Sequence, residues 1–346
     1  MSEPSTAQEE AQEAAAASAE ISDRRLLRRF LSLRTLLSFA VAVALLAVAW
    51  VLQDIKFEDV LAELRRANPW LIVLAYVTFG LTFPLRIVRW RLLLNNAAHR
   101  EHVRPDYRNW RLFQILYISW FVNGALPLKL GDIYRAFMAR ANFATSLTRT
   151  LGTIASERVF DISTLIVLVL ISSAFVSHSG RFGEDVGRII LIAAVVLAVI
   201  GAALGLMILF GRPTVSRFGA RAQGVYDRFH SGIFDSFTWR TAPVLWLVSV
   251  AIWLLEMGRL TLVMRAIGVV LGPAEIVFAG TAASLLLAAP TPGGLGAVEG
   301  GLLGLLRLVG VSPAAAVTVT YADRLISYWS VMASGFAMFL LTRLKR

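Results

Sequence analysis

Long apolar runs alternate with shorter polar or basic connections along most of the chain. A helix crosses a bilayer with ~20 consecutive apolar residues, and several runs approach that length. The pattern therefore predicts six full transmembrane helices, at about residues 35–52, 69–94, 150–176, 188–210, 242–266 and 313–341. The polar connection at 53–68 and the basic stretch at 211–241 are expected to be loops between them.

Two further apolar segments are interrupted by proline and glycine. The run from Leu112 to Ala125 is only about 14 residues long and is followed by a break at 127–131. A second run, at 273–290, resumes at 296–308 after a similar break. Because so short a run cannot cross a membrane, we expect each segment to form a re-entrant helical hairpin. An alternative count gives about eight helices. If the hairpins are instead four full crossings, the assignment of the connections to the two faces does not change.

The two interrupted segments align at one constant offset, which places Pro127 over Pro292 and Gly131 over Gly296. Each is followed at nearly the same distance by a charged cluster, at 157–161 in the first copy and at 323–328 in the second. We interpret this as an internal duplication, with repeats at about 69–176 and 242–341. Two unrelated interhelical turns would explain the prolines and glycines but not the matched charges.

Composition supports this class of protein. Hydrophobic residues make up 57% and charged residues 16% of the 346 residues, and the mean hydropathy is +0.66. These values are typical of an all-α polytopic membrane protein. Residues 1–23, rich in Ala, Glu and Ser, are expected to form a disordered tail, and residues 24–346 a single transmembrane domain.

Several kinds of chemistry are not expected. The chain has no cysteine, and its four histidines are scattered, so neither disulfides nor a metal site is indicated. The sequence contains no phosphate-binding loop of the ATPase type and no pairing of a nucleophile with a base. We therefore expect no metal, no other cofactor and no enzymatic activity.

The charge distribution predicts how the chain sits in the membrane. The net charge is +11, and the basic residues lie beside apolar runs, which favours membrane topology over nucleic-acid binding. The N-terminal segment, the stretches 95–111 and 211–241 and the C-terminus would share one face and carry 17 Lys and Arg, whereas the opposite connections carry four. By the positive-inside rule both termini are cytoplasmic, at an inner (plasma) membrane. The first repeat then starts outside and the second inside, so the repeats are inverted.

This topology predicts where a binding site would form. Hairpins entering from opposite faces would meet tip to tip near the membrane centre, and the second half-helix of each would begin there, near Gly131 and Gly296. The free N–H groups at such helix starts favour an anion, and glycine lets a headgroup approach the backbone. The predicted substrate-binding residues are Lys129, Gly131, Asp132, Arg135, Glu157, Arg158, Asp161, Pro292, Gly293, Gly294, Gly296, Glu299, Arg324 and Tyr328.

Four more charged residues are secondary members of the predicted site. Arg86 and Arg89 share one helix face, and anchoring at the membrane interface explains them as well as a substrate role does. Glu256 and Arg259 have a spacing that allows them to neutralise each other. The acidic site residues would orient arginines or carry protons, with buried structural ion pairs as the alternative.

These motifs resemble a known family. The resemblance is carried by residues 127–136, Glu157, Arg158, Asp161, residues 290–299, Arg324 and Tyr328. They are similar to the transmembrane flippase domain of lysylphosphatidylglycerol synthases and to stand-alone flippase-like membrane proteins, from about Arg34 onward. The resemblance implies movement of a phospholipid or polyprenyl-linked lipid between leaflets, often by a homodimer. Stand-alone relatives have been linked to hopanoid and glycolipid pathways, which leaves the cargo open.

The sequence ends soon after the last apolar run, so we expect no aminoacyl-transferase domain and no transfer of lysine to lipid. We expect instead a flippase for an anionic, phosphate-bearing lipid of the phospholipid, polyprenyl or hopanoid type. The alternative function is that of an accessory subunit that binds a lipid and presents it to a membrane glycosyltransferase or lipid-modifying enzyme.

Overall fold

The fold is that of a computed structural model that describes residues 57–99, 107–177, 213–288 and 291–342, with isolated positions between 191 and 211. The described residues contain helices and no strand, which confirms the all-α class. The predicted tail at 1–23, the predicted span at 35–52 and most of the predicted span at 188–210 lie outside the described residues.

Four long apolar stretches form the frame of the described structure. They are α4 (Pro69–His99), α7 (Leu147–Ser177), α10 (Ala242–Ala266) and the continuous stretch of α13 (Pro313–Arg324), a π-helical turn (Leu325–Trp329) and α14 (Ser330–Leu341). These stretches contain 25 to 31 residues, or about 38 to 46 Å, which is long enough to cross a membrane. Four of the predicted spans are thus confirmed, and the protein is a membrane protein.

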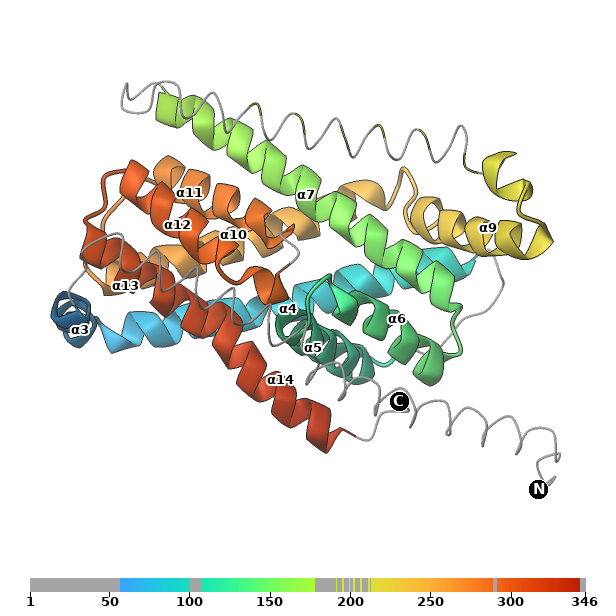
Figure 1. The fold of residues 1–346 in the computed structure, drawn as a ribbon, viewed down its shortest axis with the longest axis horizontal. Helices are drawn as coiled ribbons and strands as arrows, with labels where there is room; N and C mark the ends of the chain where they lie inside the picture. The colour runs from blue at the N-terminus through green and yellow to red at the C-terminus, as the bar shows by residue number, and fades with distance from the viewer. Residues whose placement is uncertain are drawn as a thin grey trace.

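Two pairs of shorter helices lie between the long ones. The first pair is α5 (Asn109–Ala125) and α6 (Leu130–Phe143). The second is α11 (Pro273–Leu285) and α12 (Ala297–Leu308), joined through two single turns at Leu286–Ala288 and Pro292–Gly294. The breaks between the helices lie at the Pro/Gly interruptions, where the sequence predicted them. In Figure 1 the first pair lies in the right half of the molecule and the second in the left half.

Helices α4 and α10, each the first long helix of its half, run antiparallel to each other. The backbone N–H of Asn68, just before α4, donates to the carbonyl of Ala266 at the end of α10, over 2.8 Å. At the opposite end Asn96 donates to the carbonyl of Ser236 over 2.9 Å and to the hydroxyl of Thr241 over 3.1 Å. Contacts at both ends therefore fix the direction of the pair.

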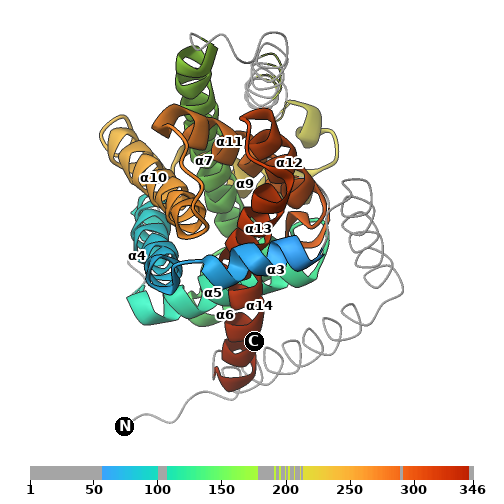
Figure 2. The ribbon, with the colours of Figure 1, turned by 90° about the vertical axis from the view of Figure 1, so that its left-hand side faces the viewer.

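Two helices lie where loops were expected, and that part of the prediction is wrong. The connection at 53–68 contains α3 (Phe57–Arg66), and the stretch at 211–241 contains α9 (Ala220–Phe234). Only one side of each helix packs on the protein, so both contain many polar residues. Neither helix therefore stands out as an apolar run long enough to cross a membrane. Helix α3 packs on α13 and lies across one end of the long helices (Figure 2). Helix α9 packs on α7.

Aromatic side chains fill the space between α4 and α5. The Phe83 ring lies 4.9 Å from the Tyr117 ring and 5.3 Å from the Trp120 ring, measured between centroids, and both pairs meet edge to face. Phe79 extends the cluster one turn along α4, with its ring 5.4 Å from that of Phe83. Edge-to-face packing of this kind adds about 0.5–1.5 kcal/mol per pair. It holds the first hairpin against the helix that carries the buried arginines described below.

The crossing of α7 and α9 depends on a pair of glycines and gives a test of the fold. A Cβ atom added at Gly152 would lie 2.5 Å from the carbonyl oxygen of Phe229 and 2.6 Å from the Cα of Gly232. Because backbone atoms cannot move aside, Gly152→Ala is expected to cost about 1–3 kcal/mol of unfolding free energy. The thermal unfolding midpoint of the purified protein in detergent measures this loss.

The matched control is Gly224→Ala on α9, where the nearest atom to an added Cβ is the side-chain Nη1 of Arg228 at 3.5 Å. Alanine is also the better helix former, so this variant should equal or exceed the wild type in thermal stability. Equal midpoints for both variants would contradict the close crossing of α7 and α9.

Candidate functional site

Twelve charged side chains gather in the interior of the described structure. They are six arginines and six carboxylates: Arg86, Arg89, Arg135, Arg158, Arg259, Arg324, Asp132, Glu157, Asp161, Glu256, Glu299 and Asp323. All are buried except Arg158 and Asp132, which are partly exposed. Those on the long stretches lie at least seven residues from either end. Each makes an ion pair, as the cost of burying an isolated charge requires.

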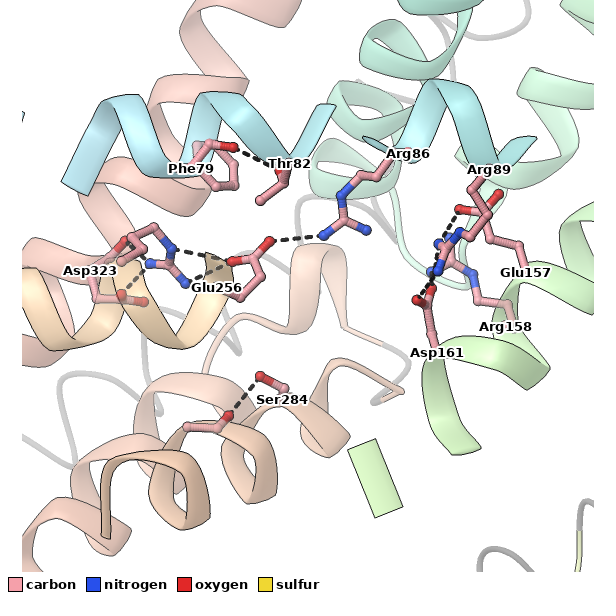
Figure 3. Close-up of polar contacts among 12 residues, drawn as sticks. Phe79, Thr82, Arg86, Arg89, Glu157, Arg158, Asp161, Glu256, Ser284 and Asp323 are labelled. Atoms are coloured by element: carbon pink, nitrogen blue, oxygen red, sulfur yellow. Dashed lines mark hydrogen bonds and ion pairs between the residues drawn. The ribbon is translucent and has the colours of Figure 1, made fainter. Parts of the chain in front are cut away.

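Arg89 is the centre of the first group, which we call the α4–α7 cluster (Arg89, Arg135, Glu157 and Asp161). Its guanidinium donates to both carboxylate oxygens of Asp161, over 2.6 and 3.1 Å, and to Glu157 over 3.1 Å. It also donates to the hydroxyl of Ser249 on α10 over 2.7 Å. Figure 3 shows Arg89 reaching from α4 toward the two acids on α7. One side chain thus joins three long helices.

Arg135 on α6 completes this cluster from the other side of Glu157. Its Nη2 lies 2.9 Å from Oε2 of Glu157, and its guanidinium carbon lies 3.8 Å above the Trp90 ring. A cation stacked on an indole face away from water gains about 2 kcal/mol. The Arg135 side chain is fully buried. Its contacts with Glu157 and Trp90 fix α6 against α7 and α4.

A second group, the α4–α10–α13 cluster, consists of Arg86, Glu256, Arg259 and Asp323. Arg86 donates to Glu256 over 2.8 Å, and Nη2 of Arg259 lies 3.1 Å from the other oxygen of the same carboxylate. Arg259 also pairs with Asp323. Arg86 stacks 4.5 Å above the Trp120 ring (Figure 3 shows the acids and Arg86). The pairing of Glu256 with Arg259 that their spacing suggested is present, within a larger network.

Each hairpin contributes one further pair of the same design. Asp132 and Glu299 are both the third residue of their helix, α6 and α12. Asp132 lies 3.3 Å from Arg158 on α7, and Glu299 lies 2.6 Å from Arg324 on α13. The arginine follows the acid by 26 residues in the first pair and by 25 in the second. The two halves of the chain therefore use equivalent groups at equivalent helix starts.

The second hairpin tip carries its own anion. Gly296, the residue before α12, has a φ of +82°, and its N–H donates to Oε2 of Glu299 over 2.7 Å. Arg324 donates to the carbonyl of Gly293 over 3.0 Å. The expectation that the Gly296 N–H is free for a ligand is therefore wrong, because a carboxylate one turn along the same helix accepts it.

The first hairpin tip holds two residues in the left-handed region. Leu128 and Lys129 have φ values of +62° and +55°, a conformation that costs about 1–3 kcal/mol for a residue with a side chain. The Leu128 side chain is exposed and Lys129 is partly buried. Lys129 interacts electrostatically with Arg158, Asp132 and Arg324, but no acid lies within 4 Å of it among the described residues. Its ammonium is thus the unpaired charge of the described interior.

Gly131 has a different role from the one its type suggested. The space for a Cβ atom there is filled by backbone atoms of Ser119 and Asn123 on α5. The glycine allows α5 and α6 to approach closely, so the structure explains it by helix packing and leaves no room for a headgroup at that atom. Asn123 also donates from its amide to Asp132 over 2.9 Å, which holds the carboxylate that faces Arg158.

The two tips meet, as the sequence predicted. The Tyr328 hydroxyl donates to the carbonyl of Gly124, the second-last residue of α5, over 3.0 Å. A Cβ atom at Gly293 would lie 3.3 Å from the Cα of Gly124. Tyr328 lies in the π-helical turn that separates α13 from α14, and its ring lies 4.7 Å from the Arg324 guanidinium. Two residues that are 204 positions apart in the sequence are therefore in contact between the tips.

The structure brings most of the predicted site residues close together, but several of them have other partners than the sequence suggested. Arg158 lies 3.8 Å from Asp161, as their spacing allows, but each has a nearer partner elsewhere. Arg86 and Arg89 are buried and paired, so anchoring at the membrane interface does not explain them. The predicted binding set lacks Asp323, Trp90, Trp120 and Asn123, of which only Asp323 lay in a recognised charged motif. Among the described residues, no group of His, Asp and Glu could hold a metal.

Comparisons with known proteins agree with this architecture. The chain matches the profile of the family described as lysylphosphatidylglycerol synthase TM region over residues 36–335. It is similar to a UPF0104 membrane protein of Methanocaldococcus jannaschii, with 30% identity across 63% of this chain and 93% of the relative. A UPF0104 membrane protein of Methanothermobacter thermautotrophicus is 26% identical across 85% and 91%. Glycosyltransferase AglD of Haloferax volcanii is 26% identical across 86% of this chain and 53% of AglD.

Removing one arginine tests the stability of the α4–α7 cluster. Arg89→Met fits an apolar side chain into the site but leaves Glu157 and Asp161 short of their main counter-charge. Uncompensated buried carboxylates are expected to cost about 3–5 kcal/mol of unfolding free energy, read as a lower thermal midpoint in detergent.

Arg91→Met is the matched control, since Arg91 is exposed two residues away and its side chain donates, within the described part of the chain, to Asn109 alone, over 3.1 Å. It should leave the midpoint unchanged within about 0.5 kcal/mol. The cluster would not be a stabilising centre if Arg89→Met and Arg91→Met shifted the midpoint alike.

Proposed function

We propose that this chain, which belongs to the family of the lysylphosphatidylglycerol synthase transmembrane region, moves an anionic lipid between the leaflets of the membrane. The lipid would carry a phosphate and have the tails of a phospholipid, a polyprenyl chain or a hopanoid. The proposal assigns no chemical step to the chain, and its family and apolar helices support a lipid-related role in the membrane.

One observation carries the proposal: an incompletely neutralised cationic site lies where the two hairpin tips meet. The Arg158 side chain is 38% exposed, whereas the other arginine side chains of the interior are at most 9% exposed. Lys129 stands beside it without a paired acid in the described structure. Two accessible cations in a membrane protein favour binding of an anion such as a phosphate.

The neighbours of these cations favour a lipid over a small soluble anion. Leu128 and Ile133 flank Lys129 and Asp132 and are 69% and 52% exposed. Leu325 and Trp329, which border Tyr328 in the π-helical turn, are also exposed. Apolar side chains this open to the surroundings suit a site that faces the bilayer, where lipid tails cover them. A headgroup could then bind Arg158 and Lys129 while its tails stay in the membrane.

The proposal includes two inverted repeats and alternating access. The antiparallel α4 and α10 and the hairpins in opposite halves of the molecule are the arrangement that an inverted duplication would produce (Figure 1). Transport would then open the site to one leaflet and next to the other by movement of one repeat against the other. An inner membrane, cytoplasmic termini and a homodimer belong to the same proposal and rest on the charge pattern and the resemblance.

A second candidate function has one observation in its favour. The relative AglD is named as a glycosyltransferase, and the region similar to this chain makes up 53% of it. A region of this kind beside an enzyme suits an accessory role, in which a lipid is bound and presented without crossing the membrane. Such a protein needs an opening toward one leaflet only.

The test is leaflet movement of fluorescent phosphatidylglycerol and of a polyprenyl phosphate in proteoliposomes. Wild-type protein should equilibrate at least one of them faster than empty vesicles. Arg158→Ala should slow that rate about tenfold or more, since a lost charge-assisted contact is worth ~1.5–3 kcal/mol.

Arg140→Ala is the matched control, because Arg140 lies exposed in the last turn of α6. It should leave the rate and the thermal midpoint unchanged. Arg158→Ala should remain folded with a somewhat lower midpoint, because Asp132 and Asp161 lose a partly exposed ion-pair partner. If wild type moves neither lipid but is thermally stabilised by one of them, transport is rejected and the accessory role is adopted.

A further inference from the structure

The charged clusters between the long helices and the hairpin tips, taken together with Lys129, have one more positive than negative charge. Six arginines face six carboxylates, and all twelve are joined in ion pairs. Lys129 is the thirteenth charge, and no acid lies within 4 Å of it among the described residues. Residues 289 and 290, which the structure leaves undescribed at the second tip, are Ala and Pro and add no charge. Without a ligand, the twelve paired charges and Lys129 together therefore carry one net positive charge.

The surplus lies at the point where the two halves meet. Lys129 interacts electrostatically with Arg158 from the first half and Arg324 from the second, and both repel it. Asp132 is the acid that attracts it among the residues that the structure describes. Asp132 itself is held by Asn123 and paired with Arg158, so its charge is already shared. An anion at this point would relieve the repulsion among three cations.

The backbone places Lys129 there at a cost. Leu128 and Lys129 are consecutive residues with side chains in the left-handed region, where glycine would be free of strain. The turn directs Leu128 outward, exposed, and leaves Lys129 partly buried beside the tip of α6. Strained residues persist where the surrounding structure holds them, and they concentrate at binding sites. The lysine is thus held in position and not merely tolerated at a flexible tip.

We infer that the headgroup bound at the tips carries a single net negative charge, as a phosphodiester does, and that Lys129 is the residue that selects for it. This inference rests on the proposed binding of an anionic lipid at Arg158 and Lys129. A phosphodiester would bring this group of thirteen charges to neutrality. A phosphomonoester carries nearly two negative charges at pH 7 and would leave one in excess, and a zwitterionic headgroup would leave the lysine uncompensated.

Two sources of a phosphodiester fit this chemistry: a glycerophospholipid, and a polyprenyl chain joined through one phosphate to a sugar. The experiment therefore uses matched pairs within each source. Fluorescent phosphatidylglycerol is compared with phosphatidic acid, and a polyprenyl-phosphoryl sugar with the polyprenyl phosphate. Phosphatidylcholine supplies the zwitterionic case. Leaflet movement and thermal stabilisation of the detergent-purified protein are measured for each lipid.

Wild type should prefer the diester over the monoester about tenfold within at least one pair, in rate or in the lipid concentration that stabilises it. Lys129→Gln removes the surplus charge and should abolish that preference and raise the relative rate or binding of phosphatidylcholine. Lys129→Arg keeps the charge and should restore the preference for the diester. Arg140→Gln, exposed at the end of α6, is the matched control and should behave as wild type.

The outcomes separate this inference from the proposed function. The inference is overturned while transport stands if wild type moves diester and monoester lipids alike and Lys129→Gln changes neither the diester-to-monoester ratio nor the relative rate of phosphatidylcholine. If no lipid moves, transport fails, and the thermal-stabilisation series alone decides the inference: a diester preference that depends on Lys129 supports it, and equal stabilisation by both members of each pair overturns it.

Discussion

The requirement that a charge in an apolar interior find a counter-charge organises this structure. Helix α4 carries two buried arginines three residues apart, and they pair with acids in different halves of the molecule. Arg89 joins α4 to Glu157 and Asp161 on α7, and Arg86 joins it to Glu256 and, through Arg259, to Asp323. One helix is thereby fixed to both halves by groups that cannot be exposed to lipid without a large cost.

The hairpins depend on the same requirement. Asp132 and Glu299 stand at the starts of α6 and α12, where the helix dipole favours an acid, and each reaches an arginine on the long helix that follows. The second of these pairs is buried and the first is partly exposed. The two equivalent ion pairs thus differ in exposure. The more exposed pair, Asp132 with Arg158, lies beside Lys129, which has no acid partner among the described residues.

Sequence reasoning predicted the positions of the long helices and of the helix breaks because apolar length and Pro/Gly interruptions are properties of contiguous residues. It also found most of the charged residues that meet in the interior. It could not predict which residues pair, since Arg89 and Asp161 are 72 positions apart and their contact depends on how two helices are rotated. Gly131 and Gly296 show the same limit. Their residue type predicted a break in the helix, but not that backbone atoms of α5 lie against Gly131 or that Glu299 accepts the N–H of Gly296.

The meeting of the tips has a mechanical consequence. At Gly124 the two halves meet through the hydrogen bond from the Tyr328 hydroxyl, through the close approach of Gly293, and through the side chain of Met332. Neither glycine can be replaced by a larger residue without moving the Met332 or Tyr328 side chain, so the packing between the tips depends on both glycines. The π-helical turn that holds Tyr328 supplies an extra residue in its helix at that point, and releasing it would shift the tyrosine without unwinding α13 or α14. In the proposed transport, this single turn of backbone would therefore have to move before the tips could separate.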